Sequence, residues 1–350
     1  MSALGASVPI AAADLGAAPR AQPLWDFVRG SGLRSLVVCD SKNPNAKYSV
    51  LLIAPDGRPQ MAVKIATTAT AGLAIEAERR ALLDMEASWP GLAGVPRVLD
   101  AVDFDGRPSL VMTAVAGTPM RTSYLRWRHT ARRSSVAADF AAAESWAAQF
   151  QSTTAQGSAP LEMDAGVSAR LRSRHAECDG IDADVEAFAA ICARLRRHEV
   201  ARTAVHGDLW AANILLAGGA VSGVVDWEAA EPSGVPARDI ARFAHMYALF
   251  LDRRTREGRR VAGHRVLRAG DWGASVNHAV DGTGWFPELF RRFLQTNLVR
   301  LGAPAAIWRD LALAAVAEVA ALADNDEYAR LHLGLFRTLA SRTDGSSRTP

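Results

Sequence analysis

The segment 205–228 holds three polar residues whose types and spacing suit phosphoryl transfer. Asp208 and Asn213 lie five residues apart on one predicted loop, and Asp226 follows a predicted β-hairpin. In such an arrangement one carboxylate can accept the proton of a hydroxyl group while the other two groups hold Mg²⁺ on a nucleotide. Mg²⁺ prefers hard oxygen ligands and takes few of them from the protein. The segment therefore predicts a phosphoryl-transfer site with bound Mg²⁺.

Two regions of different character must position this segment. The first third of the chain alternates β-rich runs with turns, whereas the remainder has helical periodicity. Strands are predicted at 33–40, 49–54, 61–65, 96–99 and 109–114, and a helix at 74–87 with Leu73 and Met85 on its apolar side. Further helices are predicted at 136–151, 185–197, 239–251, 285–301 and 307–323. Because the pattern changes near Gly117, we expect an α+β chain with lobes at 1–116 and 117–350.

Lys64 and Glu78 are the residues of the first region that suit the same chemistry. Lys64 closes the predicted strand 61–65, and Glu78 lies on the helix that follows. A strand lysine held by a helix carboxylate places an ammonium group on the α and β phosphates in kinase-like sites. Glu76 is two residues away and therefore points to another face of the helix. We predict that Glu78 is the partner of Lys64.

Lysine use gives an independent indication. The chain has 40 Lys plus Arg residues but only three lysines, Lys42, Lys47 and Lys64, all in the first region. A lysine kept against such an arginine bias marks a place that needs a compact ammonium group. Lys42 and Lys47 flank the loop 43–45, where kinase-like folds cover the nucleotide phosphates, so we predict that both bind nucleotide. The alternative is that both are solvated loop lysines.

Composition and charge exclude several other classes of protein. With 350 residues, 49% of them hydrophobic, the chain can bury a sizeable core. The net charge of +3 requires no nucleic-acid partner, and no nucleic-acid-binding module is evident. Three cysteines without metal or redox spacing favour a reducing cytoplasm. Since residues 1–20 lack a signal-peptide pattern and the apolar run 311–323 is too short to span a bilayer, we expect a cytoplasmic protein without stable membrane insertion.

The runs 206–215, 224–228 and 238–241 resemble the motifs of the aminoglycoside phosphotransferase and choline kinase-like superfamily of small-molecule kinases. Lys64, Glu78 and a predicted hinge at 113–117 extend a weaker match over most of the chain. The resemblance implies a bilobal protein-kinase-like fold, with a small antiparallel-sheet N-lobe and a larger, mainly helical C-lobe. It also implies transfer of the γ-phosphate of ATP or GTP, with Mg²⁺, to a hydroxyl group of a small molecule.

The resemblance also implies a role for each matching residue. Asp208 would be the catalytic base, and Asn213 and Asp226 would be ligands of Mg²⁺. Lys64 would bind the α and β phosphates, and Glu78 would orient it. These five residues form the predicted catalytic and phosphate-binding centre.

Other matching residues would bind the base or support the loop. Main-chain groups of Thr113, Ala114 and Val115 would meet the purine. His206 and Asp239 would hold the catalytic loop in place without touching substrate. We therefore expect the hinge to contribute to cofactor binding through its backbone.

Two features depart from the family pattern, and one of them, the glycine-free loop 41–49, supports a different class of function. The loop 41–49 has no glycine, so close approach of its backbone to phosphate is less assured, and the helix end 147–151 lacks the expected histidine. The alternative is a pseudokinase-like module that holds a nucleotide or a partner without transferring phosphate. Against it, the predicted base and both metal positions are filled. A polyanion binder that uses the arginine-rich stretches is a third reading.

The sequence leaves the acceptor open. Arginines at 121, 126, 128, 132 and 133, and a second stretch at 253–268, either face an anionic group or are solvated helix faces. A polycationic aminoglycoside would instead need carboxylates, and the candidates are Asp271, Asp281, Glu288, Asp324, Asp326 and Glu327. We expect a neutral hydroxylated metabolite or sugar, with an aminoglycoside-type antibiotic as the alternative. The insertion 258–284 is predicted to be a mobile loop over the acceptor.

Three residues beside the motifs have two interpretations each. Glu228 is either a further ligand or an ion-paired side chain, and Trp210 and Trp227 either line the acceptor pocket or pack in the core. His245, on an apolar helix, is predicted to be a core histidine outside the site.

Overall fold

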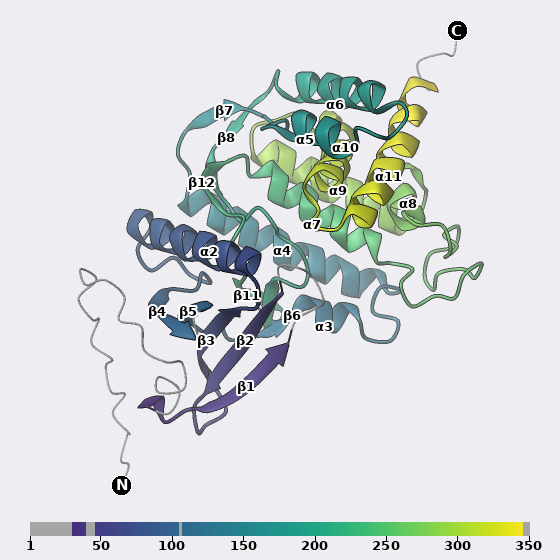
Figure 1. Ribbon diagram of the computed structural model, residues 1–350. Coiled ribbons are helices and arrows are strands. Elements are labelled where there is room, and N and C mark those ends of the chain that lie inside the picture. Colours follow the sequence, from purple (N-terminus) through teal and green to yellow (C-terminus); the bar gives the residue numbers. More distant parts are fainter. Residues whose placement is uncertain (1–29, 40–45, 105–106, 346–350) are drawn as a thin grey trace.

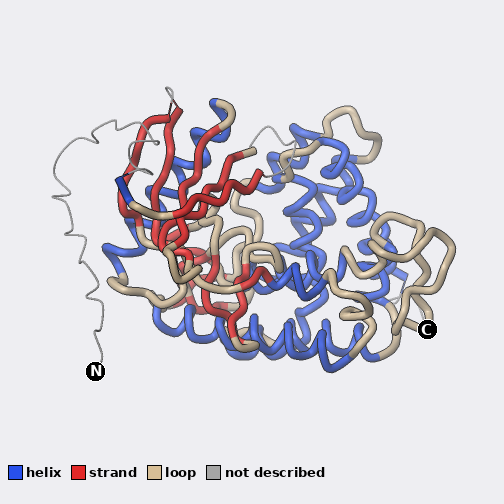
Figure 2. The backbone as a smooth tube through the Cα atoms, turned by 90° about the horizontal axis from the view of Figure 1, so that it is seen from below, coloured by secondary structure: helices blue, strands red, loops and turns tan. Residues whose placement is uncertain are grey.

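A computed structural model describes residues 30–39, 46–104 and 107–345. In Figure 1 the purple and blue strands lie at one end of the molecule and the teal to yellow helices at the other, and Figure 2 shows the same separation from below. The N-terminal region is an antiparallel sheet with a helix packed on it, and the C-terminal region is mainly helical. The predicted α+β, protein-kinase-like fold is confirmed.

The N-terminal sheet has the strand order β1-β2-β3-β5-β4, with every neighbouring pair antiparallel. Lys64 lies in its central strand, opposite Ser49 on one side and Leu110 on the other. The turn between the second and third strands needs Gly57, whose φ is +84°. The strands are β1 (Arg34–Cys39), β2 (Lys47–Ile53), β3 (Pro59–Ala66), β4 (Val98–Phe104) and β5 (Arg107–Thr113).

The helix α2 (Ala69–Ser88) begins earlier than predicted because Thr68 caps it: the Thr68 hydroxyl accepts the N–H of Ala71 at 3.1 Å. Its buried face includes Ile75 and Met85, but Leu73 is 75% exposed, so the predicted apolar side was wrong by part of a turn. The error arose because the buried face carries a charge, Glu78, that an apolar pattern does not anticipate.

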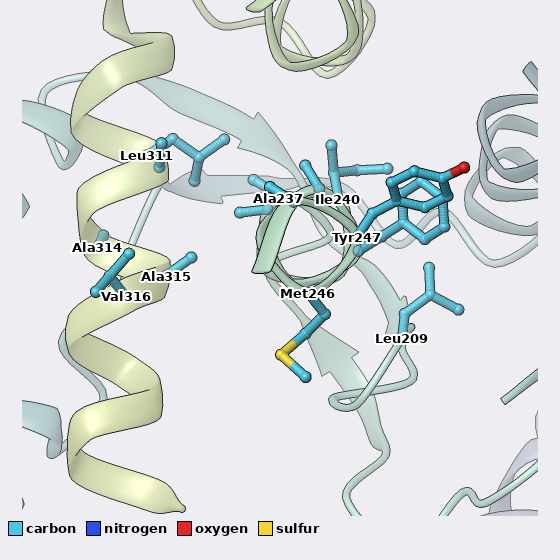
Figure 3. Packing of buried hydrophobic residues seen from close by; sticks show 14 of the residues in the cluster. Leu209, Ala237, Ile240, Met246, Tyr247, Leu311, Ala314, Ala315 and Val316 are labelled. Carbon is cyan, nitrogen blue, oxygen red and sulfur yellow. The ribbon is translucent and has the colours of Figure 1, made fainter. Parts of the chain in front are cut away.

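The C-terminal region builds its core around the helices α7 and α10. Figure 3 shows Leu311 and Val316 of α10 in one cluster with Met246 and Tyr247 of α7 and with Leu209, which follows Asp208. The helices are α3 (Met120–Tyr124), α4 (Arg133–Thr153), α5 (Val167–Arg174), α6 (Ile181–Leu195), α7 (Ala237–Leu249), α8 (Ala274–Asp281), α9 (Trp285–Arg300), α10 (Trp308–Leu322) and α11 (Asp326–Gly345), with a 3₁₀ turn at Ala305–Ile307. The loop that carries Asp208 is thereby tied to the largest buried cluster of the residues described.

Short strands in this region carry the motif residues. They are β6 (Thr118–Pro119), β7 (Ser158–Pro160), β8 (Glu199–Ala201), β9 (Thr203–Val205), β10 (Ile214–Ala217), β11 (Ala220–Val224) and β12 (Glu231–Gly234). The predicted hairpin is β10–β11, and β6 pairs with β10 on its other side. The hairpin therefore begins next to Asn213 and ends next to Asp226.

Three predictions of local structure were wrong. The strand predicted at 96–99 is β4 at Val98–Phe104, whose two aspartates hid it. The helix α11 was not predicted, because its polar residues and the acidic run at its start weaken its apolar pattern. The mobile loop predicted at 258–284 contains α8, and its remainder packs on the protein: His264 is buried and its Nε2 lies 2.9 Å from the carbonyl oxygen of Thr130.

Within the described ranges, no helix is both long and apolar enough to cross a membrane.

Candidate active site

The loop between β9 and β10 presents Asp208 and Asn213, and its shape depends on Gly207. Gly207 has a φ of +81°, and a Cβ at this position would lie 2.1 Å from the carbonyl oxygen of Ala229. Only glycine fits between the loop and the segment that follows Asp226. The glycine of the His-Gly-Asp run is therefore explained by close backbone packing.

Asp239, at the start of α7, binds two backbone N–H groups of this loop. Its two carboxylate oxygens accept the backbone N–H groups of His206 at 2.7 Å and Gly207 at 2.8 Å. Burial raises the pKa of Asp239, which these two bonds and the nearby His206 oppose. The His206 ring lies 2.9 Å from the carbonyl oxygen of Val225, so it links the loop to the strand that leads into Asp226. His206 and Asp239 thus fix the backbone of the loop through hydrogen bonds.

Both oxygens of the Asp208 carboxylate have partners. Oδ1 accepts two hydrogen bonds from the Arg242 guanidinium, at 2.8 and 3.1 Å, and Oδ2 accepts a long bond of 3.2 Å from Asn213 Nδ2. The side chain of Asp208 is nevertheless 34% exposed. Oδ1 is therefore firmly held, whereas Oδ2 is the oxygen that a hydroxyl group can approach.

Asp226 has a backbone conformation that side chains seldom adopt. Its φ is +66°, in the left-handed region, which costs energy for most residues and clusters at functional sites. The Val225 N–H donates to the Asn213 carbonyl at 2.9 Å, so the two predicted metal positions adjoin. One carboxylate oxygen of Asp226 binds the Lys64 ammonium group, which lowers the pKa of Asp226.

Lys64 connects the two regions of the molecule. Its Nζ lies 2.7 and 2.6 Å from the two carboxylate oxygens of Glu78 and also binds Asp226. Burial disfavours the ammonium, but these two carboxylates outweigh it and raise the pKa of Lys64. Glu78 is fully buried and also accepts the Trp227 N–H at 3.2 Å. The predicted pair of Lys64 with Glu78 is present, whereas Glu76 binds Arg79 and Arg80 on the outer face.

The oxygens left over suit Mg²⁺. The Asn213 amide nitrogen donates to Asp208, which directs Asn213 Oδ1 away as an acceptor. Lys64 binds Oδ1 of Asp226, which leaves Oδ2. One amide and one carboxylate oxygen on adjoining segments match an ion that takes few protein ligands and completes its shell with phosphates and water.

The predicted hinge offers fewer backbone groups than expected. The Thr113 N–H donates to Arg97 O at 2.9 Å and the Ala114 N–H to Gln60 O at 3.0 Å, so both are used within the sheet. The Val115 side chain packs against β11: a Cβ on Gly223 would lie 2.5 Å from Val115 Cγ1. Of the three hinge N–H groups, that of Val115 has no acceptor among the residues described.

The two predicted loop lysines have different outcomes. Lys47 is the first residue of β2, forms an ion pair with Glu228, and has 11% of its side chain exposed. Burial and the neighbouring Lys64 lower its pKa. Lys47 is therefore not a solvated loop lysine. Of the two interpretations of Glu228 given above, the structure supports the ion-paired side chain. Lys42 lies outside the described residues.

The two tryptophans also differ. Trp227 is fully buried, and its Nε1 donates to the Val224 carbonyl at 2.8 Å, so it packs in the core. Trp210 is half-buried at a shallow pocket between the catalytic loop and the end of α7. His245 is buried as predicted, with its Nε2 3.0 Å from that of His332.

Sequence reasoning missed Arg242, the residue that contacts Asp208. The signal was present: Arg242 lies three residues after Asp239 on a helix with few charges, so both side chains reach the same loop. Tyr328 of α11 was also missed. Its hydroxyl lies 3.7 Å from Met246 Sδ, and it is coupled electrostatically to both Arg242 and Asp208. Tyr328 had no signal, because α11 itself was not predicted.

Comparisons with known proteins agree with this geometry. No curated protein matches the chain. Among solved structures, the aminoglycoside phosphotransferase APH(4)-Ia is 13% identical with a TM-score of 0.56 over 91% of this chain and 97% of that one. A thermostable mutant of that enzyme, in a ternary complex with AMP-PNP and hygromycin B, is 15% identical with a TM-score of 0.55 over 88% and 93% of the two chains.

A second enzyme has the same fold: the macrolide 2'-phosphotransferase MphH from Brachybacterium faecium is 16% identical with a TM-score of 0.51 over 89% of this chain and 97% of that one. At such low identity these likenesses show the fold. The model of the phosphotransferase enzyme family matches residues 45–274, well over half of the chain. This match includes Lys64, Glu78 and the complete motif block. The chain belongs to the phosphotransferase enzyme family.

Proposed function

We propose that the chain transfers the γ-phosphate of ATP or GTP, bound with Mg²⁺, to a hydroxyl group of a sugar-like or other hydroxylated metabolite or of an aminoglycoside-type antibiotic. The observation that carries the proposal is the continuous chain of contacts from Glu78 through Lys64 to Asp226. It joins the predicted phosphate-binding cation to the predicted metal ligand across both regions.

Each side chain would have a separate role in the reaction. Lys64 would bind the α and β phosphates, and Lys47 and the backbone of Val115 would contact other parts of the nucleotide. Asn213 Oδ1 and Asp226 Oδ2 would hold Mg²⁺, which would supply positive charge to the phosphate groups of the nucleotide. Asp208 would orient the acceptor hydroxyl through Oδ2 and accept its proton late in an in-line transfer. Because Oδ1 is fixed by Arg242, the carboxylate keeps one orientation during this step.

The solved structure with bound AMP-PNP and hygromycin B supports a nucleotide donor and a separate acceptor on this fold. The alternative is a pseudokinase-like module that binds nucleotide without transfer. Its support is the glycine-free loop 41–49. The carboxylate of Asp208, whose side chain is 34% exposed, favours catalysis over this alternative.

The test is nucleotide consumption by purified protein with Mg²⁺ and a panel of acceptors: aminoglycosides, macrolides, choline-like amines, homoserine and free sugars. We expect acceptor-dependent release of ADP or GDP that falls at least 10³-fold in Asp208→Asn, while nucleotide affinity stays within about threefold. Calorimetric titration with AMP-PNP checks the affinity.

The matched control is Asp164→Asn, because Asp164 is a half-buried carboxylate of the same region outside the motif block. Near-normal turnover in Asp208→Asn would overturn the assignment of the base. Tight nucleotide binding with no turnover for any acceptor or for water would favour the binding-module alternative.

A further inference from the structure

A shallow pocket lies beside the loop that carries Asp208. It is lined by Trp210 of the loop, by Arg121 and Tyr124 of α3, by Met246 of α7, and by Phe250 and Arg253, which follow α7. It encloses about 20 Å³, roughly the space of a single small group. Such a pocket can hold one end of a ligand whose remainder lies outside it.

The pocket continues directly from Asp208. Arg242, which binds Asp208, and Met246 and Phe250 follow one another at four-residue spacing on one face of α7. Two such steps along a helix span about 12 Å. On the opposite wall the Arg121 N–H donates to the Ala211 carbonyl at 2.8 Å, which fixes α3 to the loop. A molecule with its hydroxyl group at Asp208 can therefore reach the pocket with its other end.

Two guanidinium groups at this pocket have no carboxylate partner among the described residues. Arg121 and Arg253 are both exposed, and the Arg253 guanidinium lies 5.4 Å above the Phe250 ring. By contrast, Arg174, Arg238 and Arg337 each bind a carboxylate within 2.7 Å. Asp252, the neighbour of Arg253, is half-buried, and burial raises its pKa. The pocket thus has an excess of positive charge.

The carboxylates that could bind a polycationic acceptor do not line this pocket. Asp281 binds Arg309 at 2.9 Å and Arg342 at 3.4 Å, and Asp326 binds Arg174 at 2.7 Å. None of the six candidate carboxylates named from the sequence is among the residues that line the pocket. The charged side chains at the pocket are therefore the two arginines.

We propose, on the basis of the proposed function, that the acceptor carries a carboxylate or phosphate group that binds Arg121 and Arg253 while its hydroxyl group meets Asp208. Guanidinium groups bind both anions in paired hydrogen bonds. Trp210 and Phe250, whose ring centroids are 6.3 Å apart, pack against the body of the acceptor next to this group. The site selects an anionic hydroxylated molecule against a polycation.

The experiment measures binding of four small probes by ligand-observed NMR: phenyl phosphate, phenylacetate, benzyl alcohol and benzylamine. Saturating AMP-PNP with Mg²⁺ occupies the nucleotide site, so that the anions cannot bind there. A fragment of this size with one charged group is expected to bind with a Kd of about a few mM. We expect both anions to bind in this range, and the alcohol and the amine to bind at least tenfold more weakly. The tighter of the two anions identifies the group.

The double variant Arg121→Gln/Arg253→Gln should weaken anion binding at least tenfold. The matched control, Arg126→Gln/Arg254→Gln, removes two exposed arginines of the same stretches that do not line the pocket, and it should leave binding unchanged. Benzylamine binding equal to that of the anions, equal losses in both double variants, or no anion binding up to about 10 mM would overturn the proposal.

The same samples separate this proposal from the proposed function. Arginine-dependent anion binding in a protein that fails to bind AMP-PNP would keep the anion site and overturn the kinase proposal. Nucleotide binding and Asp208-dependent hydrolysis without arginine-dependent anion binding would overturn the anion site alone.

Discussion

The two sides of the candidate site differ in how completely their charges are matched. On the nucleotide side, the side chain of Lys64 is 9% exposed and lies between Glu78 and Asp226, and Lys47 is paired with Glu228. On the acceptor side, Asp208 and Arg242 are 34% and 25% exposed, and Arg121 and Arg253 have no carboxylate partner in the described ranges.

The paired charges contribute to the stability of the fold, whereas the exposed, unpaired charges are available to bind a substrate. A buried charge without partners is costly, so the nucleotide side is complete before any ligand binds. The acceptor side keeps exposed charges, because their partners belong to the ligand. A preorganised donor side and an open acceptor side allow one fold to phosphorylate different molecules.

The largest expected effect on stability comes from breaking the matched side. Glu78→Gln leaves Lys64 with one carboxylate fewer in a buried site, so we expect a loss of about 3 kcal/mol in the free energy of unfolding and much weaker nucleotide binding. Urea denaturation and titration with AMP-PNP measure the two effects. Glu76→Gln is the control on the same helix, since its pairs with Arg79 and Arg80 lie on the exposed face and contribute at most about 1 kcal/mol. Equal losses in both variants would contradict the comparison.

On the acceptor side, Arg242→Gln should reduce kcat about 100-fold with little change in nucleotide affinity. The substitution frees Oδ1 of Asp208, so that the carboxylate no longer keeps one orientation. Steady-state kinetics with any active acceptor, or with water as acceptor, measures the effect. Arg242→Lys retains the charge without the two-point contact and should recover part of the rate. If Arg242→Gln lowered only the nucleotide affinity, Arg242 would act on the nucleotide side, which would contradict the comparison.

This asymmetry also explains what could be predicted from the sequence. Asp208, Asn213 and Asp226 lie close together in the chain, so their spacing alone brings them to one site. Lys64 and Glu78 lie 14 residues apart on a strand and the helix that packs on it, and their charges were evident in apolar surroundings. The acceptor side joins α3, the end of α7 and α11, which no local pattern connects. Arg242 was overlooked although a local signal existed, its position three residues after Asp239 on the same helix, and Leu73 was misplaced because a buried charge interrupted the apolar face of α2.

The helix that carries Arg242 rests on buried histidines that make the acceptor side sensitive to acid. Burial lowers the pKa of His332 to about 4 and holds that of His245 well below its usual value; the ring nitrogens of the pair are 3.0 Å apart. Arg242 disfavours a proton on either ring, whereas the Tyr328 carbonyl, 2.8 Å from His332 Nδ1, favours one on His332. In the unfolded chain a histidine titrates near 6.5.

The unfolded state therefore binds more protons between these values, and stability falls as the pH decreases from 6.5 towards 4. For His332 alone the loss at pH 5 is about 2 kcal/mol. Urea denaturation at pH 7.5 and pH 5 should show a smaller difference in His332→Gln than in the unchanged protein. His198→Gln, at a partly exposed histidine before β8, should keep the full difference. The same pH dependence in all three proteins would show that the histidine pair does not contribute.

The smallest expected effect tests whether the positive charge of Lys47 is used entirely by its ion pair with Glu228. Lys47→Met removes an ammonium group that is near Lys64 and Asp226 but already paired with Glu228. We expect nucleotide affinity to fall by about threefold to tenfold, or roughly 1 kcal/mol, because the charge is shared between Glu228 and the phosphates. Glu228→Gln is the matched control: it frees Lys47 for the nucleotide and should leave affinity unchanged or raise it. Titration with AMP-PNP and Mg²⁺ measures both variants. Equal losses of nucleotide affinity in the two variants would show that Glu228 is needed to hold Lys47 against the nucleotide. An unchanged affinity in Lys47→Met would show that Lys47 contributes only to its ion pair with Glu228.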